Sequence, residues 1–510
     1  MAFWIVCSFG CGESVHREPQ LVFVRDGLVA DFTVGDEARK LPDGRFLVAR
    51  DWVSGETVTV GAIAAVAPAM AQCLPLYIVP LGDVSAVVAQ GGEPPDTALA
   101  FSPTGDRLAI GSYSGALVVV DGWTGEVTAH RQLAETMVKR VAWSSDGAVV
   151  YAAEQSPDAY VHAFRADDLD ILWSYRLADE VGSSAPLADD LYGVYSLPAA
   201  YSLVVLDDGD LLLTAVHGWT DKEGQRRNRS RLLRLTADGM VRQGWPAEAA
   251  DATFLSLVVD RDRIAIPLGR SAAGPSPPEL PINGVQLLDD DLTPLRGFTV
   301  EPLRPWFDSV FIWEALDLSA QSLVVGLGDG RLISFATHGS GGWEKDLGKP
   351  IMAGDVPVSV SIGHLQCVDE ETIVLTSRTN IPYSAAAPEL RPPTSHPSEN
   401  TLWVFEGQRL KWTWRGPHVL QGFTISPNGR HLVVGAGSRD SDDRFDLFGA
   451  LVFDREMAGS GEERLRAFCP TTGPVFFRQA VTDDGRIATA EVPFTKGSNL
   501  KGRYQVTVFR

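Results

Sequence analysis

The most regular feature of the chain is a succession of short apolar runs separated by turns, clearest over residues 97–130. Apolar runs at 99–101, 108–111, 117–120 and 127–130 are separated there by clusters of Gly, Pro, Ser and Asp. Such runs, bounded by such clusters, are typical of β-strands joined by hairpins. We therefore predict four antiparallel strands, which cannot bury both faces of their sheet unless further copies pack beside it.

The tight turn between the first two strands of this unit recurs along the chain. Asp-Gly and Asn-Gly pairs in the copies supply the left-handed backbone conformations that tight hairpins need. Strong copies lie at 102–106, 144–147, 207–210, 426–430 and 483–486, and weaker ones at 260–263, 319–322 and 369–372. These turns predict an all-β fold: a β-propeller of four-stranded antiparallel blades, about eight in number with seven as the alternative, spaced roughly 40 to 60 residues apart.

The two ends of this repeat array predict how it closes. Residues 475–510 contain three apolar runs, whereas residues 84–90 form an isolated apolar run before the first full unit. Pairing that run with the last unit would complete a fourth strand and remove an open sheet edge. We therefore expect a propeller over residues 81–510, preceded by a β-rich N-terminal extension or small domain over residues 1–80.

Four stretches carry a family resemblance. AFSPTGDRLAIGSYSGALVVVD and TISPNGRHLVVGAG resemble bacterial propeller repeats of the WD-repeat and YVTN kinds. DAYVHAFRADDLDILWSYRL and ENTLWVFEGQRLKWTWRG are similar to quinoprotein-type blades, in which a Trp ends the blade. The resemblance covers residues 80–510 and implies the propeller fold, which serves scaffolds, receptors and enzymes alike. The Trp-Asp dipeptide of strict WD repeats is absent from the ends of the third strands.

Charge and apolar patterning narrow the classes of partner. The chain has 44 basic and 65 acidic residues, a formal net charge of −21, and a field of that sign repels nucleic-acid phosphates. No run of about 18 apolar residues is present, so we expect no membrane-spanning helix. Protein partners are therefore favoured over nucleic acid and membranes.

The number and spacing of the cysteines indicate the redox state of the compartment in which the protein resides. Their number is odd and most lie far apart, at positions 7, 11, 73, 367 and 469. This pattern argues against a disulfide framework and favours a reducing compartment. The N-terminus lacks the basic region and the long apolar region of a signal peptide, so a cytoplasmic location is expected.

Nearly all variation in unit length falls between the second and third strands. The insertions cover residues 217–229, 271–283, 380–400, 438–446 and 493–502. In a propeller these loops emerge on one face, and elaborated loops on a rigid scaffold are where binding usually resides. We therefore expect partner proteins to bind this insertion-rich face.

Two of these insertions and one aromatic stretch provide the candidate partner-binding residues. Residues 217–234 are rich in Arg, which can clamp carboxylates of an anionic partner, although the same residues could simply balance nearby acids. Residues 304–313 are densely aromatic and could anchor an interface or pack between blades. The candidates are Trp219, Arg226, Arg227, Arg229, Trp306, Phe307, Arg439 and Arg444.

The chemical motifs are sparse. Cys7, Cys11 and His16 lack the second ligand pair of a zinc finger, and the acidic residues in 439–446 lack the Gly-containing pattern of a calcium loop. No nucleophile elbow, phosphate-binding loop or paired-His motif is present, and the adjacent-cysteine pair of many quinone-dependent dehydrogenases is missing. We expect neither a metal nor a cofactor.

Three functions are consistent with these patterns. The favoured hypothesis is a non-catalytic intracellular scaffold, a bacterial protein-interaction propeller within a multi-protein complex. The alternative is a hydrolase, lactonase or lyase whose site at the mouth of the central channel draws single residues from several blades. A small-ligand sensor that uses the channel is the third. The nine histidines are scattered without a shared register, which favours the scaffold.

Overall fold

The computed structural model describes residues 71–510 except for 83, 85–86, 89–95, 186–193, 270–279, 281–282, 304–309, 311, 349–350, 354–355, 379–395, 397, 417–418, 438–447 and 497–498. Within residues 1–70 it describes only short strands, which form one three-stranded sheet and two hairpins. These strands are β1 Pro19–Leu21, β2 Val24–Arg25, β3 Leu28–Val29, β4 Arg39–Lys40, β5 Phe46–Leu47, β6 Ala49–Asp51 and β7 Thr57–Val58.

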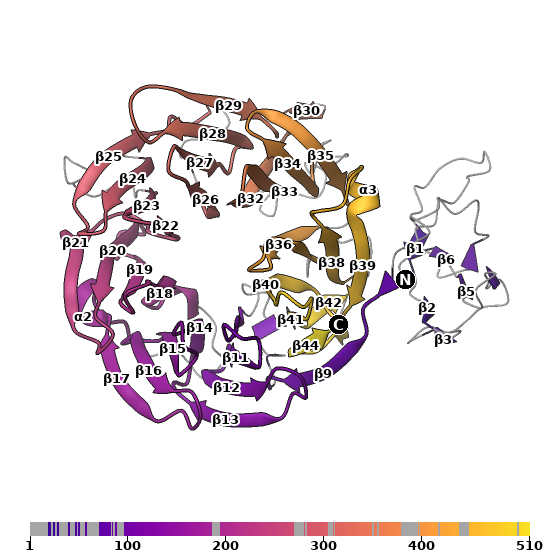
Figure 1. The fold of residues 1–510 in the computed structure, drawn as a ribbon, viewed down its shortest axis with the longest axis horizontal. Coiled ribbons are helices and arrows are strands. Elements are labelled where there is room, and N and C mark those ends of the chain that lie inside the picture. The colour runs from indigo at the N-terminus through magenta and orange to yellow at the C-terminus, as the bar shows by residue number, and fades with distance from the viewer. Residues whose placement is uncertain are drawn as a thin grey trace. The chain divides into compact units, whose positions relative to one another are not determined.

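The described chain is a β-propeller that divides into two compact units, and the larger unit covers residues 81–416. Its described strands form six four-stranded antiparallel blades. Within this unit the first strand of each blade is innermost and the fourth is outermost (Figure 1). The blades are β10–β13 (Ala98–Phe101, Arg107–Gly111, Ala116–Asp121, Val127–Gln132), β14–β17 (Met137–Trp143, Val149–Gln155, Tyr160–Arg165, Ile171–Arg176), β18–β21 (Ala199–Val205, Leu211–Thr220, Arg226–Leu235, Val241–Ala250), β22–β25 (Val258–Asp260, Arg263–Leu268, Gly284–Asp289, Pro294–Thr299), β26–β29 (Glu314–Leu318, Ser322–Gly326, Arg331–Ala336, Gly342–Asp346) and β32–β35 (Val360–Val368, Glu371–Arg378, Thr401–Glu406, Arg409–Arg415).

Short elements connect these blades. The helix α2 (Ala178–Val181) and the 3-10 turn η1 (Val194–Ser196) lie between the second and third blades. The hairpin β30–β31 (Ile351–Ala353 and Val356–Val358) lies between the fifth and sixth. The innermost strands of those two blades also pair directly, because β26 runs parallel to β32 with Glu314 opposite His364.

The other unit combines residues 1–80 with residues 417–510 and contains the last two blades. The seventh is β36–β39 (Leu420–Ile425, His431–Ala436, Gly449–Asp454, Leu465–Pro470), preceded at its fourth strand by the helix α3 (Gly461–Arg464) and extended by the parallel strand β8 (Ala71–Gln72). The eighth has the order β40-β41-β44-β9 (Val475–Val481, Ile487–Glu491, Gln505–Phe509, Pro75–Pro80). The hairpin β42–β43 (Phe494–Lys496 and Asn499–Lys501) lies between β41 and β44.

The closing strand comes from the N-terminal side, as the sequence predicts, but the predicted residues are wrong. Strand β9, residues 75–80, pairs antiparallel with β44, with Val79 opposite Val506. Residues 84–90 do not supply this strand, because Val87 and Val88 are helical and Val88 N–H donates to the carbonyl of Val84 at 3.1 Å. The prolines at both ends of β9 make this segment look unlike a strand in the sequence, but a strand at the edge of a sheet tolerates Pro.

The predicted first-to-second-strand turns are confirmed in all eight blades. Gly105, Gly147 and Gly209 have positive φ in three of the strong copies. In two weaker copies Arg261 (φ 56°) and Asp369 (φ 57°) take the left-handed conformation in place of Gly. These turns use one left-handed residue each, a conformation that Gly adopts most easily, whereas the copy at 319–322 has no residue with positive φ.

Apolar side chains pack between successive blades of the larger unit and form its core. Between the first two blades, for example, Leu117 and Val119 lie in one buried cluster with Val150 and Phe164. Burying each such side chain stabilises the fold by about 1.5–3 kcal/mol. Each blade has two faces, so it needs a neighbouring blade on each side to cover its apolar residues. This need explains why the blade is repeated.

Tryptophans add directional links to this packing. The indole Nε1 of Trp143 donates to the carbonyl oxygen of Ala100 at 2.9 Å, across the first and second blades. Trp173 Nε1 likewise donates to the carbonyl oxygen of Ala237 at 2.8 Å, across the second and third. The first bond satisfies the indole donor of Trp143, which is 7% exposed, and the second ties the more exposed Trp173 to the next blade.

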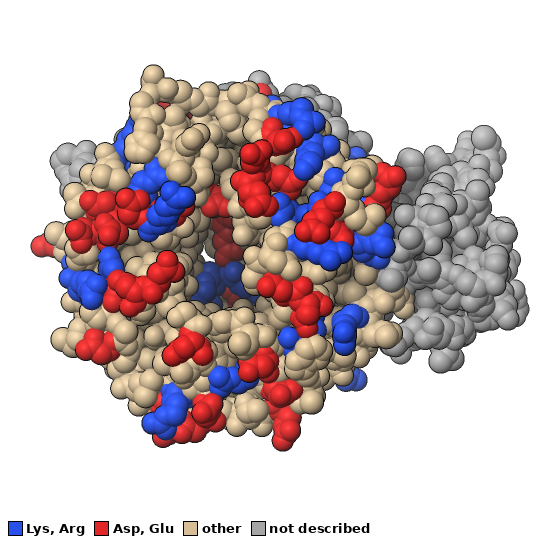
Figure 2. Space-filling model, in the orientation of Figure 1, with Lys and Arg blue, Asp and Glu red and all other residues tan. Residues whose placement is uncertain are grey.

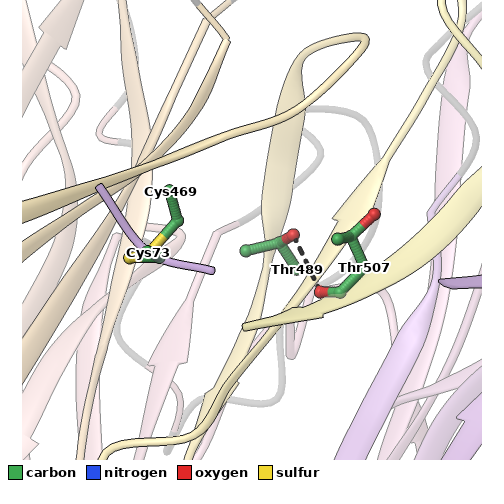
Figure 3. Close-up of a disulfide and its surroundings, with 4 residues drawn as sticks. All are labelled: Cys73, Cys469, Thr489 and Thr507. Carbon is green, nitrogen blue, oxygen red and sulfur yellow. Dashed lines mark hydrogen bonds between the residues drawn. A yellow bond between two sulfur atoms is a disulfide. The ribbon is translucent and has the colours of Figure 1, made fainter. Parts of the chain in front are cut away.

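A disulfide joins Cys73 to Cys469, 396 residues apart, although the cysteine pattern argued against a disulfide framework (Figure 3). Both cysteines are buried, and the linkage becomes possible because β8 pairs with β39 just before Cys73. Nearby in Figure 3 the Thr489 hydroxyl donates to the carbonyl of Thr507 at 3.2 Å, between β41 and β44. Disulfides persist in oxidising compartments, so this bond weighs against the reducing compartment inferred from the sequence, and the location stays a prediction.

Candidate functional site

The predicted insertion at 217–229 is a regular hairpin and not an irregular loop. Strands β19 and β20 are ten residues each and stay in register to the pair Thr220 and Arg226, with the turn at residues 221–225. The turn is fixed by Asp221, whose carboxylate accepts the backbone N–H of Gln225 at 2.8 Å. The insertion was expected to be a loop because its residues are polar, but the cross-strand ladder continues through them regardless of side-chain polarity.

Four side chains on one face of this hairpin form what we call the hairpin patch: His217, Trp219, Arg227 and Arg229. His217 is paired with Arg229 and Trp219 with Arg227 across the ladder, and residues paired in this way share a face. The guanidinium carbon of Arg229 lies 5.8 Å from the Trp219 ring centroid, and the Trp219 and His217 rings are 5.0 Å apart. Arg229 is exposed, Trp219 half-buried and His217 buried.

The hairpin patch is anchored at its base and at its tip. At the base, Nδ1 of His217 lies 3.3 Å from the carbonyl oxygen of Val181 in α2. At the tip, Arg227 Nε is 2.8 Å from the Asp221 carboxylate. Backbone N–H donation from Gln225, followed by the Arg227 hydrogen bond, lowers the pKa of Asp221 below its usual value. Arg229 is thus the exposed cation of a patch whose other members are fixed.

Arginines nearer the base of the hairpin are used inside the fold. Arg231 forms an ion pair with Glu180, and its Nε donates to the carbonyl of Pro246 at 3.0 Å. Arg234, only 9% exposed, pairs with Asp208 at 2.6 Å and Asp210 at 2.8 Å. The alternative interpretation of the basic stretch, that it balances nearby acids, is therefore correct for these residues.

Several predicted candidates lie outside the described residues. They are Trp306 and Phe307 of the aromatic stretch, Arg439 and Arg444 with the acidic loop around them, and Cys7, Cys11 and His16. Arg226 is placed in β20, but its side chain is not described. Of the candidate partner-binding residues, the structure brings together Trp219, Arg227 and Arg229.

A second group of polar side chains lies on the innermost strands of the larger unit and just before the first of them, and we call it the inner charge cluster: Asp96, Lys139, Arg140, Glu314 and His364. The Lys139 ammonium is 3.0 Å from the Asp96 carboxylate. Arg140 lies 3.7 Å from Asp96 and 3.4 Å from Glu314. Glu314 Oε2 is in turn 3.7 Å from His364 Nδ1. Figure 2 shows acidic and basic side chains meeting on this inner side.

Aromatic rings enclose the lysine of this cluster. The Lys139 ammonium lies 4.8 Å from the Tyr195 ring centroid and 5.1 Å from that of Tyr201. Lys139 is 4% exposed, so its charge is stabilised by two aromatic faces and one carboxylate in place of water. The cluster is thereby a neutralised network that links strands of several blades.

The inner charge cluster is not predicted from the sequence. The histidines share no register along the chain, whereas His364 is matched with Glu314 by the parallel pairing of β26 and β32. A usable signal was the presence of charged residues in first strands, where Lys139-Arg140 interrupts an otherwise apolar run. Among the described residues no group of three or more His, Cys, Asp or Glu side chains could hold a metal ion.

Among known proteins, solved structures alone give matches to this chain. No family model matches the chain, and no curated protein matches it. The Dos1 propeller superposes with a TM-score of 0.50 at 11% identity, over 86% of this chain and 94% of that one. The C-terminal WD40 domain of Sif2 and BamB from Moraxella catarrhalis have TM-scores of 0.49 and 0.46 at 12% and 13% identity, each over 86% of this chain and 98% of the other. The chain is thus similar to β-propellers, and the likeness shows the fold alone.

No described helix is long and apolar enough to span a bilayer.

Proposed function

We propose that this chain is a protein-interaction propeller whose partner binds the hairpin patch. The observation that carries the proposal is the exposed Arg229 guanidinium over the half-buried Trp219 ring, held on a hairpin longer than the strands of the first blade. Trp and Arg are the side chains that most often dominate binding at interfaces. The propeller fold of this chain is compatible with such a role.

The charge of the patch defines the partner's chemistry. In a chain of net charge −21, Arg229 is an exposed cation, and Lys222 in the turn of the same hairpin is also exposed. A guanidinium can bind a carboxylate through two parallel hydrogen bonds. The proposed partner is therefore a protein that presents an acidic segment, and membership of a multi-protein complex belongs to the same proposal.

The fold of the patch reduces the cost of binding. A stack held between a cross-strand ladder and α2 has little freedom to lose when a partner docks. The two ring contacts and the His217 to Val181 contact fix Trp219 in advance. Removing the ring should therefore weaken binding more than its contact area alone would indicate.

Affinity purification of the tagged full chain from its host tests the proposal. Wild type is compared with Trp219→Ala, Arg229→Glu and the control Arg466→Glu, which reverses an exposed arginine in the other unit. We expect a stoichiometric partner with wild type and the control, lost with both patch variants, and weakened binding of the purified pair as salt rises. A partner retained by both patch variants, or no partner at all, would overturn the proposal.

A further inference from the structure

A serine, a histidine and a glutamate lie in hydrogen-bonding sequence across three neighbouring strands of the second blade. Ser174 on β17 is directly opposite His162 on β16, and its Oγ lies 2.7 Å from His162 Nδ1. The other ring nitrogen, Nε2, lies 3.0 Å from Oε1 of Glu154 on β15. A nucleophile within reach of a base that is itself oriented by a third group is the arrangement of activated serines.

The surroundings of Glu154 determine which histidine nitrogen carries the proton. Its second oxygen, Oε2, accepts the Ser156 hydroxyl at 2.8 Å, and Ser156 Oγ accepts the backbone N–H of Ala159 at 2.9 Å. The carboxylate is thus fixed as an acceptor for the Nε2 proton of His162. Nδ1 then has a free lone pair, which accepts the Ser174 hydroxyl proton.

The ring is also held in place by packing. The Tyr160 and His162 rings are stacked, with centroids 5.7 Å apart and an interplanar angle of 22°. On the other side along the strand, Phe164 lies 5.4 Å from the His162 ring. A base that cannot rotate keeps its nitrogen on the serine hydroxyl.

The serine is exposed to solvent, whereas the histidine and the glutamate are buried. Ser174 is exposed on the outermost strand, whereas His162 is 9% and Glu154 4% exposed. Arg176 lies two residues beyond Ser174 and on the same face of the strand, and its guanidinium is paired with Asp158 at 2.6 Å and with Asp179. The Ser174 hydroxyl is therefore open to a reagent from solvent.

We propose that Ser174 is an activated nucleophile that takes an acyl group from carboxylic esters. Oγ attacks the ester carbonyl carbon while its proton passes to His162 Nδ1. The C–O bond to the alcohol then breaks, the alcohol leaves with that proton, and the acyl group stays on Ser174 until water hydrolyses it to the acid. This activity is independent of the hairpin patch and goes beyond the proposed interaction function.

Labelling with a fluorophosphonate tests the nucleophile directly. In that reaction Ser174 Oγ bonds to phosphorus, fluoride leaves, and the hydroxyl proton passes to His162. The full chain is treated, and the label is located by peptide mass spectrometry. We expect labelling at Ser174 at least about tenfold faster than at the exposed Ser145.

Variants separate activation from structure. Ser174→Ala should abolish both the label and the burst of p-nitrophenol released from p-nitrophenyl acetate, and Ser145→Ala should leave them unchanged. Glu154→Gln keeps the side-chain volume but no longer fixes the tautomer, so labelling should slow by about tenfold or more while the thermal unfolding midpoint moves little. Labelling of Ser174 no faster than Ser145, or an unchanged rate in Glu154→Gln, would overturn the proposal.

Discussion

The Arg140 guanidinium lies 3.4 Å from the carboxylate of Glu314, although 174 residues separate the two and their blades are not consecutive. Arg140 belongs to the innermost strand of the second blade and Glu314 to that of the fifth. Both side chains are 15% exposed. The contact therefore connects distant parts of the larger unit in a setting where water screens the charges only partly.

Removing one member of this pair should destabilise the larger unit. Glu314→Gln takes one carboxylate away from Arg140, which keeps its contact with Asp96, and removes the ion pair with His364, so we expect a loss of about 1–3 kcal/mol. The measurement is denaturant unfolding of Arg140→Gln, Glu314→Gln and the double variant.

The coupling energy from that cycle should be about 0.5–3 kcal/mol. A matched cycle at Arg409 and Glu406, whose side chains are 70% and 39% exposed, should give coupling near zero. Equal coupling energies in the two cycles would show that the Arg140–Glu314 contact stabilises the fold no more than an exposed ion pair does.

The Cys73–Cys469 disulfide should stabilise the unit that contains the closing strand. It cross-links a loop of 396 residues, so its loss, by Cys73→Ser or by reduction, should cost about 2–5 kcal/mol. Peptide mapping without reductant should recover the linked peptides. The control is Cys367→Ser, which replaces a free cysteine. If reduction leaves the unfolding midpoint of the wild type unchanged, the bond is not a stabilising one.

The sequence is sufficient to predict the blades because their determinants are local. A left-handed turn residue and the flanking apolar runs specify each hairpin, and these signals lie within about ten residues of each other. Residues 97–130 accordingly show four strands where four are predicted. The closing strand is different, because β9 and residues 84–90 are both short and apolar, and only their fit against β44 distinguishes them.

Sites that depend on strand register and on the order of the blades could not be predicted from the sequence, for a physical reason. Ser174 meets His162 because β16 and β17 pair in one register, and a one-residue slip would move the two side chains to opposite faces. Glu314 meets Arg140 only because the blades between them bring their inner strands together. The hairpin patch was within reach of the sequence because its residues are neighbours along the chain.

Asp317 should make stability depend on pH. Burial raises the pKa of its carboxyl to about 6, and the charge of Asp260 adds to this, while the backbone N–H groups of Cys367 and Leu318 act in the opposite direction. A group with a raised folded-state pKa contributes stability that is fully present below its unfolded pKa. That contribution is lost as pH rises from about 4 through about 6.

Asp317→Asn should remove this component. The amide oxygen can replace only one of the two carboxylate oxygens that accept backbone N–H groups, which gives a loss that does not vary with pH. Relative to wild type, the variant should therefore gain up to about 3 kcal/mol between pH 4 and pH 7.5. The measurement is denaturant unfolding at several pH values. Parallel curves for the two proteins would contradict the assignment.

Gly115 should be among the least replaceable residues of the first blade. Its φ is +85°, and an added Cβ would lie 2.1 Å from the carbonyl oxygen of Ala134 and 2.3 Å from that of Thr136. Its own carbonyl accepts the N–H of Leu133 at 2.9 Å, so the turn cannot move away without breaking that bond. Gly115→Ala should cost about 1–2 kcal/mol for the left-handed conformation and about 1–3 kcal/mol more for the clash.

Gly224 provides the matched control for this clash. Its φ is +77°, in the turn of the β19–β20 hairpin, and an added Cβ there would meet nothing within 4 Å. Gly224→Ala should therefore cost only the conformational part, about 1–2 kcal/mol. Thermal and denaturant unfolding of the two variants should rank Gly115→Ala well below Gly224→Ala in stability. Equal losses would mean that the strands around Gly115 shift to accept a methyl group, and that this blade is less tightly packed than its contacts indicate.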